Sequence, residues 1–387
     1  MSASSPPRIV VAGAVAQKPG KAGHAWVFLQ YLLGLRDLGF RPLFIDQVHD
    51  PLQEEQRLWF QRVLSFPDPP LEGVLLDAQG GVAALSRSLR EAGARADCAA
   101  LVEESVALIN VQGYLRDGEL MQAARRRIFL DIDPGFTQMW QDLGLTDFLD
   151  GHHAYATVGG RIGRDDCPIP ACGKSWIHFL PPVHLPSWPP VSRPSSGLTS
   201  VISWRGAYGP LEYRGRTYGL RVHEFRRFWD LPSGIDDVRF QLAIDLSPAD
   251  ETDRESLISR GWEVLPSREA AGDLDSYRDY IGSSLGEFLV AKNIYVDTRC
   301  GWFSDRSACY LASGRPVLAQ DTGLGDRLPA GEGLLIFSTP QEATRQIRRL
   351  LDDYPAHARA ARRLAERHLD ARRVLRRLLE QAGVEPC

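Results

Sequence analysis

The chain has 387 residues, more than one hydrophobic core usually organises, so we expect two domains with a cleft between them. Hydrophobic residues make up 44% of the chain and charged residues 24%, an ordinary globular composition that excludes wholesale disorder. The formal net charge of -4 gives no overall basic field, and no basic stripe is recognisable, so we expect no nucleic-acid partner.

Neither a signal sequence nor a membrane span is recognisable. The opening "MSASSPPRIVV" lacks a charged segment followed by an apolar one, and no window holds about 20 consecutive apolar residues. The six cysteines are scattered without a C-x-x-C pair, and no HxH, DxD or HExxH spacing suggests a bound metal. We therefore expect a cytoplasmic monomer or homodimer with reduced thiols, no bound metal and no resident cofactor.

The first half of the chain reads as alternating strands and helices. The apolar run "RIVVAGAV" at 8–15 predicts a strand, "QKPGKAG" a loop, residues 24–40 a helix with a glycine stop, and "RPLFID" at 41–46 the next strand. Further alternation to about residue 175 indicates a mostly parallel sheet. We expect a Rossmann-like domain over residues 1–180.

Residues 181–198 are so rich in Pro and Ser that we expect a linker. Beyond it the runs "TSVISW", "RFQLAID", "GWEVLPS", "GEFLVAK" and "RPVLAQ" predict strands of a second α/β domain over residues 199–340. The Arg-rich tail, residues 341–387, predicts two or three amphipathic helices.

The segment "RCGWFSDRS" at 299–307 lies where a strand-to-helix junction of this second domain is expected. Ser304 is a candidate N-cap, and the first helical turn would hold Asp305, Arg306 and Ser307. Free N–H groups at a helix start, with Arg306, Arg299 and Lys292 nearby, favour binding of a diphosphate. The alternative is plain helix capping on an exposed turn.

These residues resemble a known family. Two Rossmann-like domains, a Pro-rich hinge and terminal helices are similar to GT-B-fold glycosyltransferases over nearly the whole chain. "RCGWFS" is similar to their "HCGWNS" motif, and "GWEVLP" resembles the "GWxPQ" loop that holds the donor base. The resemblance implies nucleoside contacts for Trp262, Val264 and Leu265, and a sugar contact for Asp321, whose alternative is an Asx-turn.

The chain also departs from the family patterns. Arg299 and Phe303 stand where the "HCGWNS" motif has its His and Asn, and Gly301 and Cys309 stand where retaining enzymes carry two glutamates. The absent acidic pair favours an inverting enzyme of a divergent bacterial branch.

The catalytic base is expected in the first domain. "GHAWVFLQYLLGLRDLGF" resembles the opening of inverting GT-B enzymes, whose histidine faces the cleft, and that histidine would be His24, with Asp131 or Asp133 as its partner carboxylate. The alternative is a polar residue in the first helical turn. His152 and His153 are candidates for acceptor contact.

Two further candidates for the donor site close the first strand of the second domain, Arg205 and Gly206. Lys292 ends the run "GEFLVAK", whereas strand alternation turns Glu287 to the opposite face.

The sequence therefore predicts transfer of a sugar from a UDP-, dTDP- or GDP-linked donor to a small-molecule acceptor, in the manner of natural-product glycosylation. One alternative is an NAD(P)-dependent oxidoreductase with Asp46 at the second strand end, although "AGAVAQKPGKAG" lacks GxGxxG. The other is a non-catalytic protein that closes on a small ligand.

Overall fold

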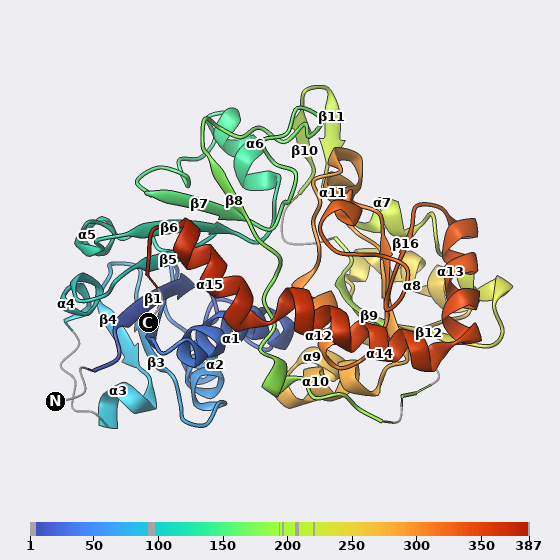
Figure 1. Ribbon diagram of the computed structural model, residues 1–387, viewed down its shortest axis with the longest axis horizontal. Helices are drawn as coiled ribbons and strands as arrows, with labels where there is room; N and C mark the ends of the chain where they lie inside the picture. The colour runs from blue at the N-terminus through green and yellow to red at the C-terminus, as the bar shows by residue number, and fades with distance from the viewer. Residues whose placement is uncertain are drawn as a thin grey trace.

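Two parallel sheets, each flanked by helices, lie side by side (Figure 1). The structure is a computed structural model that describes residues 5–91, 97–192, 194–195, 197–205, 209–219 and 221–385. The C-terminal helices run along the front of both halves in the view of Figure 1. The tail helices therefore contact both halves of the molecule.

The first sheet has, among the described residues, eight strands in the order β4-β3-β2-β1-β5-β6-β7-β8, and only β4 is antiparallel. β1 is buried along its whole length, as its run of apolar residues requires. The strands are β1 (Arg8–Gly13), β2 (Arg41–Gln47), β3 (Glu72–Leu76), β4 (Val82–Leu85), β5 (Leu108–Val111), β6 (Arg127–Asp131), β7 (Ala154–Thr157) and β8 (Trp176–His178). Its helices are α1 (Ala22–Asp37), α2 (Glu54–Ser65), α3 (Arg87–Glu91), α4 (Cys98–Glu103), α5 (Gly118–Ala123) and α6 (Phe136–Asp142).

The second sheet has, in the described part of the chain, six parallel strands in the order β13-β12-β9-β14-β15-β16. They are β9 (Gly197–Ser203), β12 (Arg239–Asp245), β13 (Trp262–Pro266), β14 (Gly286–Leu289), β15 (Val317–Gln320) and β16 (Leu334–Phe337). A separate hairpin pairs β10 (Leu211–Tyr213) with β11 (Arg216–Tyr218). The helices are α7 (Arg221–Phe225), α8 (Glu251–Ser259), α9 (Ser267–Ala271), α10 (Leu274–Ser283), α11 (Asn293–Thr298) and α12 (Asp305–Ala312).

The tail forms α13 (Pro340–Asp352), α14 (Tyr354–Leu364), a π-helical turn (Ala365–Leu369) and α15 (Ala371–Gln381). α13 packs on the second sheet, whereas α15 lies against α1 of the first. A side chain at Gly34 of α1 would come within 2.6 Å of Cβ of Ala371, so the two helices require a glycine at their crossing. The apolar face of α15 is therefore buried on α1, and its other face is exposed.

The predicted strands and tail helices are confirmed, and the Rossmann-like assignment of both halves with them. Antiparallel β4, the β10–β11 hairpin and β16 were not predicted, because strands of three or four residues show no period. The equally short β14 and β15 were predicted from the longer runs "GEFLVAK" and "RPVLAQ" that contain them. No helix of the described residues combines the length and hydrophobicity that a membrane crossing needs.

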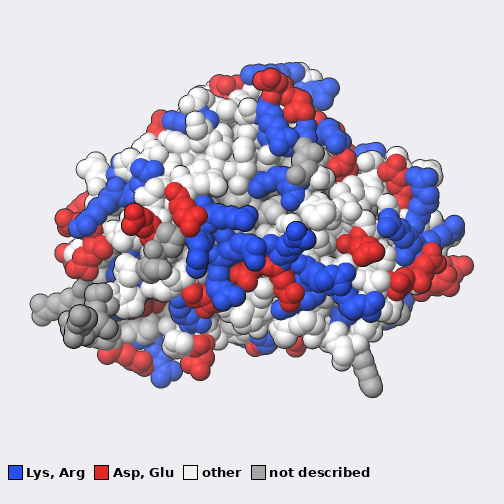
Figure 2. All heavy atoms as spheres, viewed as in Figure 1, with Lys and Arg blue, Asp and Glu red and all other residues white. Residues whose placement is uncertain are grey.

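A basic band crosses one face of the molecule, over the tail helices (Figure 2). The exposed side of α15 carries Arg372, Arg373, Arg376 and Arg377, and α14 adds Arg359 and Arg363. Only part of this charge is neutralised locally, as by Asp370 beside Arg372. The sequence analysis found no such stripe, because helical folding brings together arginines that are spread over the tail.

Candidate active site

A cleft of about 860 Å³ lies between the two sheets. Its lining residues follow the carboxyl ends of β1, β5 and β6 in the first sheet and of β9, β12 and β14 in the second. Lys18 and Asp133 come from the first sheet, and Arg205 and Lys292 from the second. Ligands bind parallel α/β sheets at this edge, where the strand order reverses, and here the reversals fall at β1/β5 and β9/β14.

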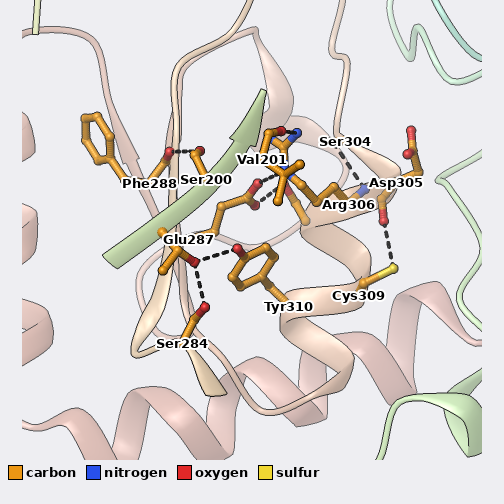
Figure 3. Close-up of polar contacts among 12 residues, drawn as sticks. Ser200, Val201, Ser284, Glu287, Phe288, Ser304, Asp305, Arg306, Cys309 and Tyr310 are labelled. Atoms are coloured by element: carbon orange, nitrogen blue, oxygen red, sulfur yellow. Dashed lines mark hydrogen bonds and ion pairs between the residues drawn. The ribbon is translucent and has the colours of Figure 1, made fainter. Parts of the chain in front are cut away.

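The amino end of α12 forms part of the cleft wall. Ser304 Oγ accepts a hydrogen bond from the backbone N–H of Arg306 at 3.2 Å, which confirms the predicted N-cap. The Arg306 side chain turns back under β9 and β14, where its Nε donates to Glu287 Oε1 at 2.6 Å and its Nη1 donates to the Val201 carbonyl (Figure 3). Glu287 is fully buried and also accepts from Ser307 Oγ. The buried carboxylate thus holds the guanidinium in one orientation.

A second guanidinium, from Arg221 at the start of α7, also lines the cleft. Burial and the nearby charge of Arg306 lower the pKa of Arg221 to about 10. Nε of Arg221 and Nη2 of Arg306 are buried and find no acceptor among the described residues. A buried donor without a partner costs about 1–3 kcal/mol. An anion bound in the cleft would offset the repulsion between the two cations.

Lys292 and Asp133 join the two sheets across the cleft. Lys292 Nζ lies 2.8 Å from Asp133 Oδ2, and the Tyr295 hydroxyl donates to Asp133 Oδ1. Burial acts to raise the pKa of Asp133, but the charge and hydrogen bond of Lys292, aided by Tyr295, outweigh it and lower that pKa overall. Asp133 is therefore ionised and already engaged.

Three of the four lysines of the chain line the cleft, namely Lys18, Lys21 and Lys292. Lys21 pairs with Asp245 at 2.5 Å, a second link between the two sheets. Lys18 Nζ lies 3.5 Å from the Tyr114 hydroxyl and makes no ion pair with a carboxylate of the described residues. Burial lowers the pKa of Lys18. The cleft lining has six Lys or Arg side chains and four Asp side chains, a small basic excess although the whole chain is acidic.

His24 lies in the first turn of α1 and lines the cleft, half-buried, as predicted. Its Nε2 lies 2.8 Å from the Ala14 carbonyl, which can only accept, so Nε2 carries the proton and Nδ1 is left to receive one. Burial, and then the charge of Lys18, lower the pKa of His24 to about 3. His24 is therefore neutral at physiological pH and a weak base while the cleft is empty of anions.

In the described structure His24 has no hydrogen bond to the carboxylate expected beside it. Both candidates, Asp131 and Asp133, bind other groups instead. Asp131 is fully buried and accepts from Gln138 Nε2 at 2.6 Å and from Thr157 Oγ1 at 2.7 Å. Asp133 is held by Lys292. The Ala14 carbonyl, rather than a carboxylate, fixes the His24 tautomer.

Several predicted donor-site residues do not line the cleft. Trp262 is buried in the second core and donates from Nε1 to the Trp229 carbonyl at 2.7 Å, and Leu265 is half-buried in β13. Arg299 and Asp321 pair with each other at 3.0 Å outside the lining. Ser307 is turned away to Glu287.

The predicted acceptor contacts His152 and His153 also lie away from the cleft lining. They precede β7, at the amino ends of the parallel strands and thus at the opposite edge of the sheet. Burial lowers the pKa of His152 to about 4, and Nδ2 of Asn110 lies 3.2 Å from its Nε2. Nδ1 of His153 accepts a hydrogen bond from the backbone N–H of Arg127.

Arg205 lines the cleft and pairs with Asp250, with Nε 2.7 Å from Oδ1. Gly206, its predicted neighbour in the donor site, lies outside the described residues. Within the described part of the chain, no three His, Cys, Asp or Glu residues gather in a way that could hold a metal ion.

Asp46, the residue on which dinucleotide binding would depend, is fully buried at the end of β2. It accepts from the Ala16 backbone at 2.5 Å and lies within 3.4 Å of Gln17 Nε2, and burial raises its pKa to about 7. Its side chain stabilises the 14–21 loop and is not accessible to a ribose hydroxyl.

Solved structures share this architecture at low sequence identity. HepE (Alr3699) of Anabaena, solved with UDP and glucose, matches with a TM-score of 0.60 and 12% identity over 97% of this chain and 99% of that one. An alpha-glucosyltransferase solved with UDP-glucose and DNA containing an abasic site matches with a TM-score of 0.60 and 13% identity over 97% and 99%. A glycosyltransferase from Rickettsia africae ESF-5 matches with a TM-score of 0.53 and 12% identity over 98% of each chain.

The chain has the GT-B fold. Its C-terminal helix returns to the first domain, as the resemblance implied. No protein-family model and no curated protein matches the sequence. The GT-B assignment therefore depends on the architecture and describes the fold alone.

Within this GT-B cleft, sequence reasoning missed Arg221, Tyr295 and Lys18 as lining residues, and Glu287 as the anchor of Arg306. Glu287 had a signal: a carboxylate inside the apolar run "GEFLV" needs a buried cationic partner. Lys18 was visible as one of four lysines. Nothing in the sequence distinguishes Arg221 from the many other arginines.

Proposed function

We propose that the protein is a glycosyltransferase that moves a sugar from a nucleoside-diphosphate donor to a small-molecule acceptor. The observation that carries the proposal is the pair of buried guanidinium groups, Arg221 and Arg306, each with an N–H donor that has no partner in the described structure. Both line a cleft that also contains Lys18, Lys292 and the start of α12. A diphosphate supplies the oxygens and the charge that this set lacks.

The likeness to solved structures supports the same donor class. HepE was solved with UDP and glucose, and the alpha-glucosyltransferase with UDP-glucose. For this chain we propose a UDP-, dTDP- or GDP-linked sugar and a natural-product acceptor. The cytoplasmic location and the monomeric or homodimeric state remain predictions.

In the proposed reaction, an acceptor hydroxyl attacks the anomeric carbon of the donor sugar. The bond from that carbon to the diphosphate oxygen breaks, and its electron pair leaves with the nucleoside diphosphate. Arg306, Arg221 and Lys292 stabilise the charge that develops on the leaving group. The hydroxyl proton passes to a base.

His24 is the proposed base. Its Nδ1 is unprotonated at neutral pH, and the proposed diphosphate would counteract Lys18, whose charge lowers the pKa of His24. Asp133 orients Lys292 through their ion pair. We also propose that residues 1–180 bind the acceptor, 181–198 link the domains, 199–340 bind the donor, and 341–387 form the tail helices.

The proposal is tested by incubating the protein with UDP-, dTDP- and GDP-glucose and measuring release of the nucleoside diphosphate. We expect slow release from one donor without acceptor, and loss of release in Arg306→Gln. The control Arg214→Gln changes a side chain that is 67% exposed and outside the cleft, and it should release normally. Release from none of the three donors, with a panel of hydroxylated acceptors added, would remove the proposal.

A further inference from the structure

A second cavity, of about 360 Å³, adjoins the cleft on the side of the first domain. It shares Gln17, Gln112, Tyr114 and Asp133 with the cleft lining. Its volume falls near the lower end of the roughly 300–1,000 Å³ that small-molecule sites occupy. A ligand in this cavity would reach the cleft where Asp133 and Tyr114 line both spaces.

Four of the eleven residues that line the cavity are Phe, Tyr or Trp. Phe136 and Trp140 come from α6, with ring centroids 5.5 Å apart, and Phe148 and Tyr114 come from the loops after α6 and β5. The guanidinium carbon of Arg116 lies 4.3 Å from the Phe148 ring centroid, which fixes this ring at the outer end. Such walls favour a flat ring as the ligand.

Gln112 lies at the boundary between the cavity and the cleft and lines both. Its Oε1 is buried and accepts no hydrogen bond from the described residues. Its backbone has φ of 51°, a left-handed conformation that is uncommon for a residue other than glycine. The next residue, Gly113, has φ of 67°, and a side chain there would meet Phe148 at 3.4 Å. Backbone of this kind is costly and concentrates at functional sites.

We infer that this cavity binds the acceptor of the proposed transfer, and that the acceptor is a hydroxylated aromatic ring. The ring packs between Trp140 and Phe148, and its hydroxyl reaches the edge of the cleft, where its proton stays available to the base. This inference rests on the proposed function for its role in catalysis.

A carbohydrate acceptor fits the cavity less well, because two of the polar groups at its boundary with the cleft are engaged. Gln17 Nε2 donates to the Gln47 carbonyl at 2.8 Å, and Asp133 is held by Lys292 and Tyr295. A sugar ring carries many hydroxyls and loses affinity where they stay unpaired. A ring with one hydroxyl leaves fewer polar groups unpaired.

Calorimetric titration with 1-naphthol, and with maltose as the carbohydrate probe, tests this inference. We expect 1-naphthol to bind, and we expect Trp140→Ala and Phe148→Ala each to weaken its binding by about 10-fold through loss of ring packing. The control Leu145→Ala changes a side chain that is 66% exposed, just beyond α6 and outside the cavity, and should leave the affinity unchanged.

Thermal stabilisation by UDP, dTDP or GDP, measured on the same four proteins, separates the two proposals. Equal stabilisation of all four shows that the variants are folded. If a nucleotide stabilises the protein while 1-naphthol fails to bind, or binds all variants equally, the acceptor inference is overturned and the proposed function stands. Trp140-dependent binding of maltose in place of 1-naphthol overturns the ligand class. If no nucleotide binds but 1-naphthol binding follows the variants, the cavity assignment is supported and the proposed function fails.

Discussion

The ion pair between Glu287 and Arg306 is expected to affect both the stability of the fold and the binding of a nucleoside diphosphate. Glu287→Gln removes the negative charge from a site where the Glu287 side chain is 0% exposed and the Arg306 side chain 12%. Removal of one partner of a buried pair costs about 3–5 kcal/mol, because the other charge stays buried. Gln keeps an oxygen for Arg306 Nε, so we expect the lower end, about 3 kcal/mol. For a domain of this size, that corresponds to a fall in Tm of roughly 6–12 °C.

The same variant should respond more strongly to ligand. A nucleoside diphosphate brings negative charge to Arg306 and compensates for the missing carboxylate, so the ligand-induced rise in Tm should exceed that of the wild type. The double variant Glu287→Met with Arg306→Met buries no charge and should regain most of the lost stability. Its Tm should no longer respond to the ligand.

Differential scanning calorimetry with and without the stabilising nucleotide measures both effects. The matched control is Glu263→Gln in β13, whose partner Arg239 is 58% exposed and whose pair is worth about 0–1 kcal/mol. A Tm for Glu287→Gln equal to that of the control, or a smaller ligand response than in the wild type, would refute the reasoning.

Other variants and conditions test separate parts of the site. His24→Ala should lower turnover by about 10²-fold and leave donor affinity unchanged in steady-state kinetics, and unchanged turnover would remove His24 as the base. Asp46 has a folded pKa raised to about 7 from 3.8, so its contribution to stability is present below pH 3.8 and lost as the pH rises through 7. Asp46→Asn should therefore gain Tm over the wild type as the pH rises from 5 to 8, and a pH-independent difference would contradict this. EDTA should leave turnover unchanged, and restoration of lost activity by Mg²⁺ or Mn²⁺ would show that metal independence is wrong.

The fold followed from the sequence because apolar runs and the Gly- or Pro-containing loops between them mark its strands and helices. The run "RIVVAGAV" and the α1 helix were recognisable from their apolar residues and from the Gly-containing loop between them. The start of α12 was predicted from Ser304 and the residues after it, because capping is a local property.

The rest of the site depends on contacts between distant residues, which local patterns do not specify. Arg299 resembled a phosphate ligand, yet it ends α11 in a left-handed conformation and reaches Asp321 instead of the cleft. His152 and His153 stand at the wrong end of β7, a fact that requires the strand direction and register. Lys292 and Asp133 are 159 positions apart and meet only when both domains are in place.

Calorimetric titration of the wild type and Arg306→Gln with UDP, dTDP, GDP and ADP tests the central claim most directly. One nucleoside diphosphate should bind the wild type, its monophosphate should bind far more weakly, and Arg306→Gln should lose most of the affinity while Arg214→Gln retains it. Binding that is absent for all four nucleotides, or unaffected by removal of the β-phosphate and of Arg306, would contradict the assignment of the cleft as a diphosphate site.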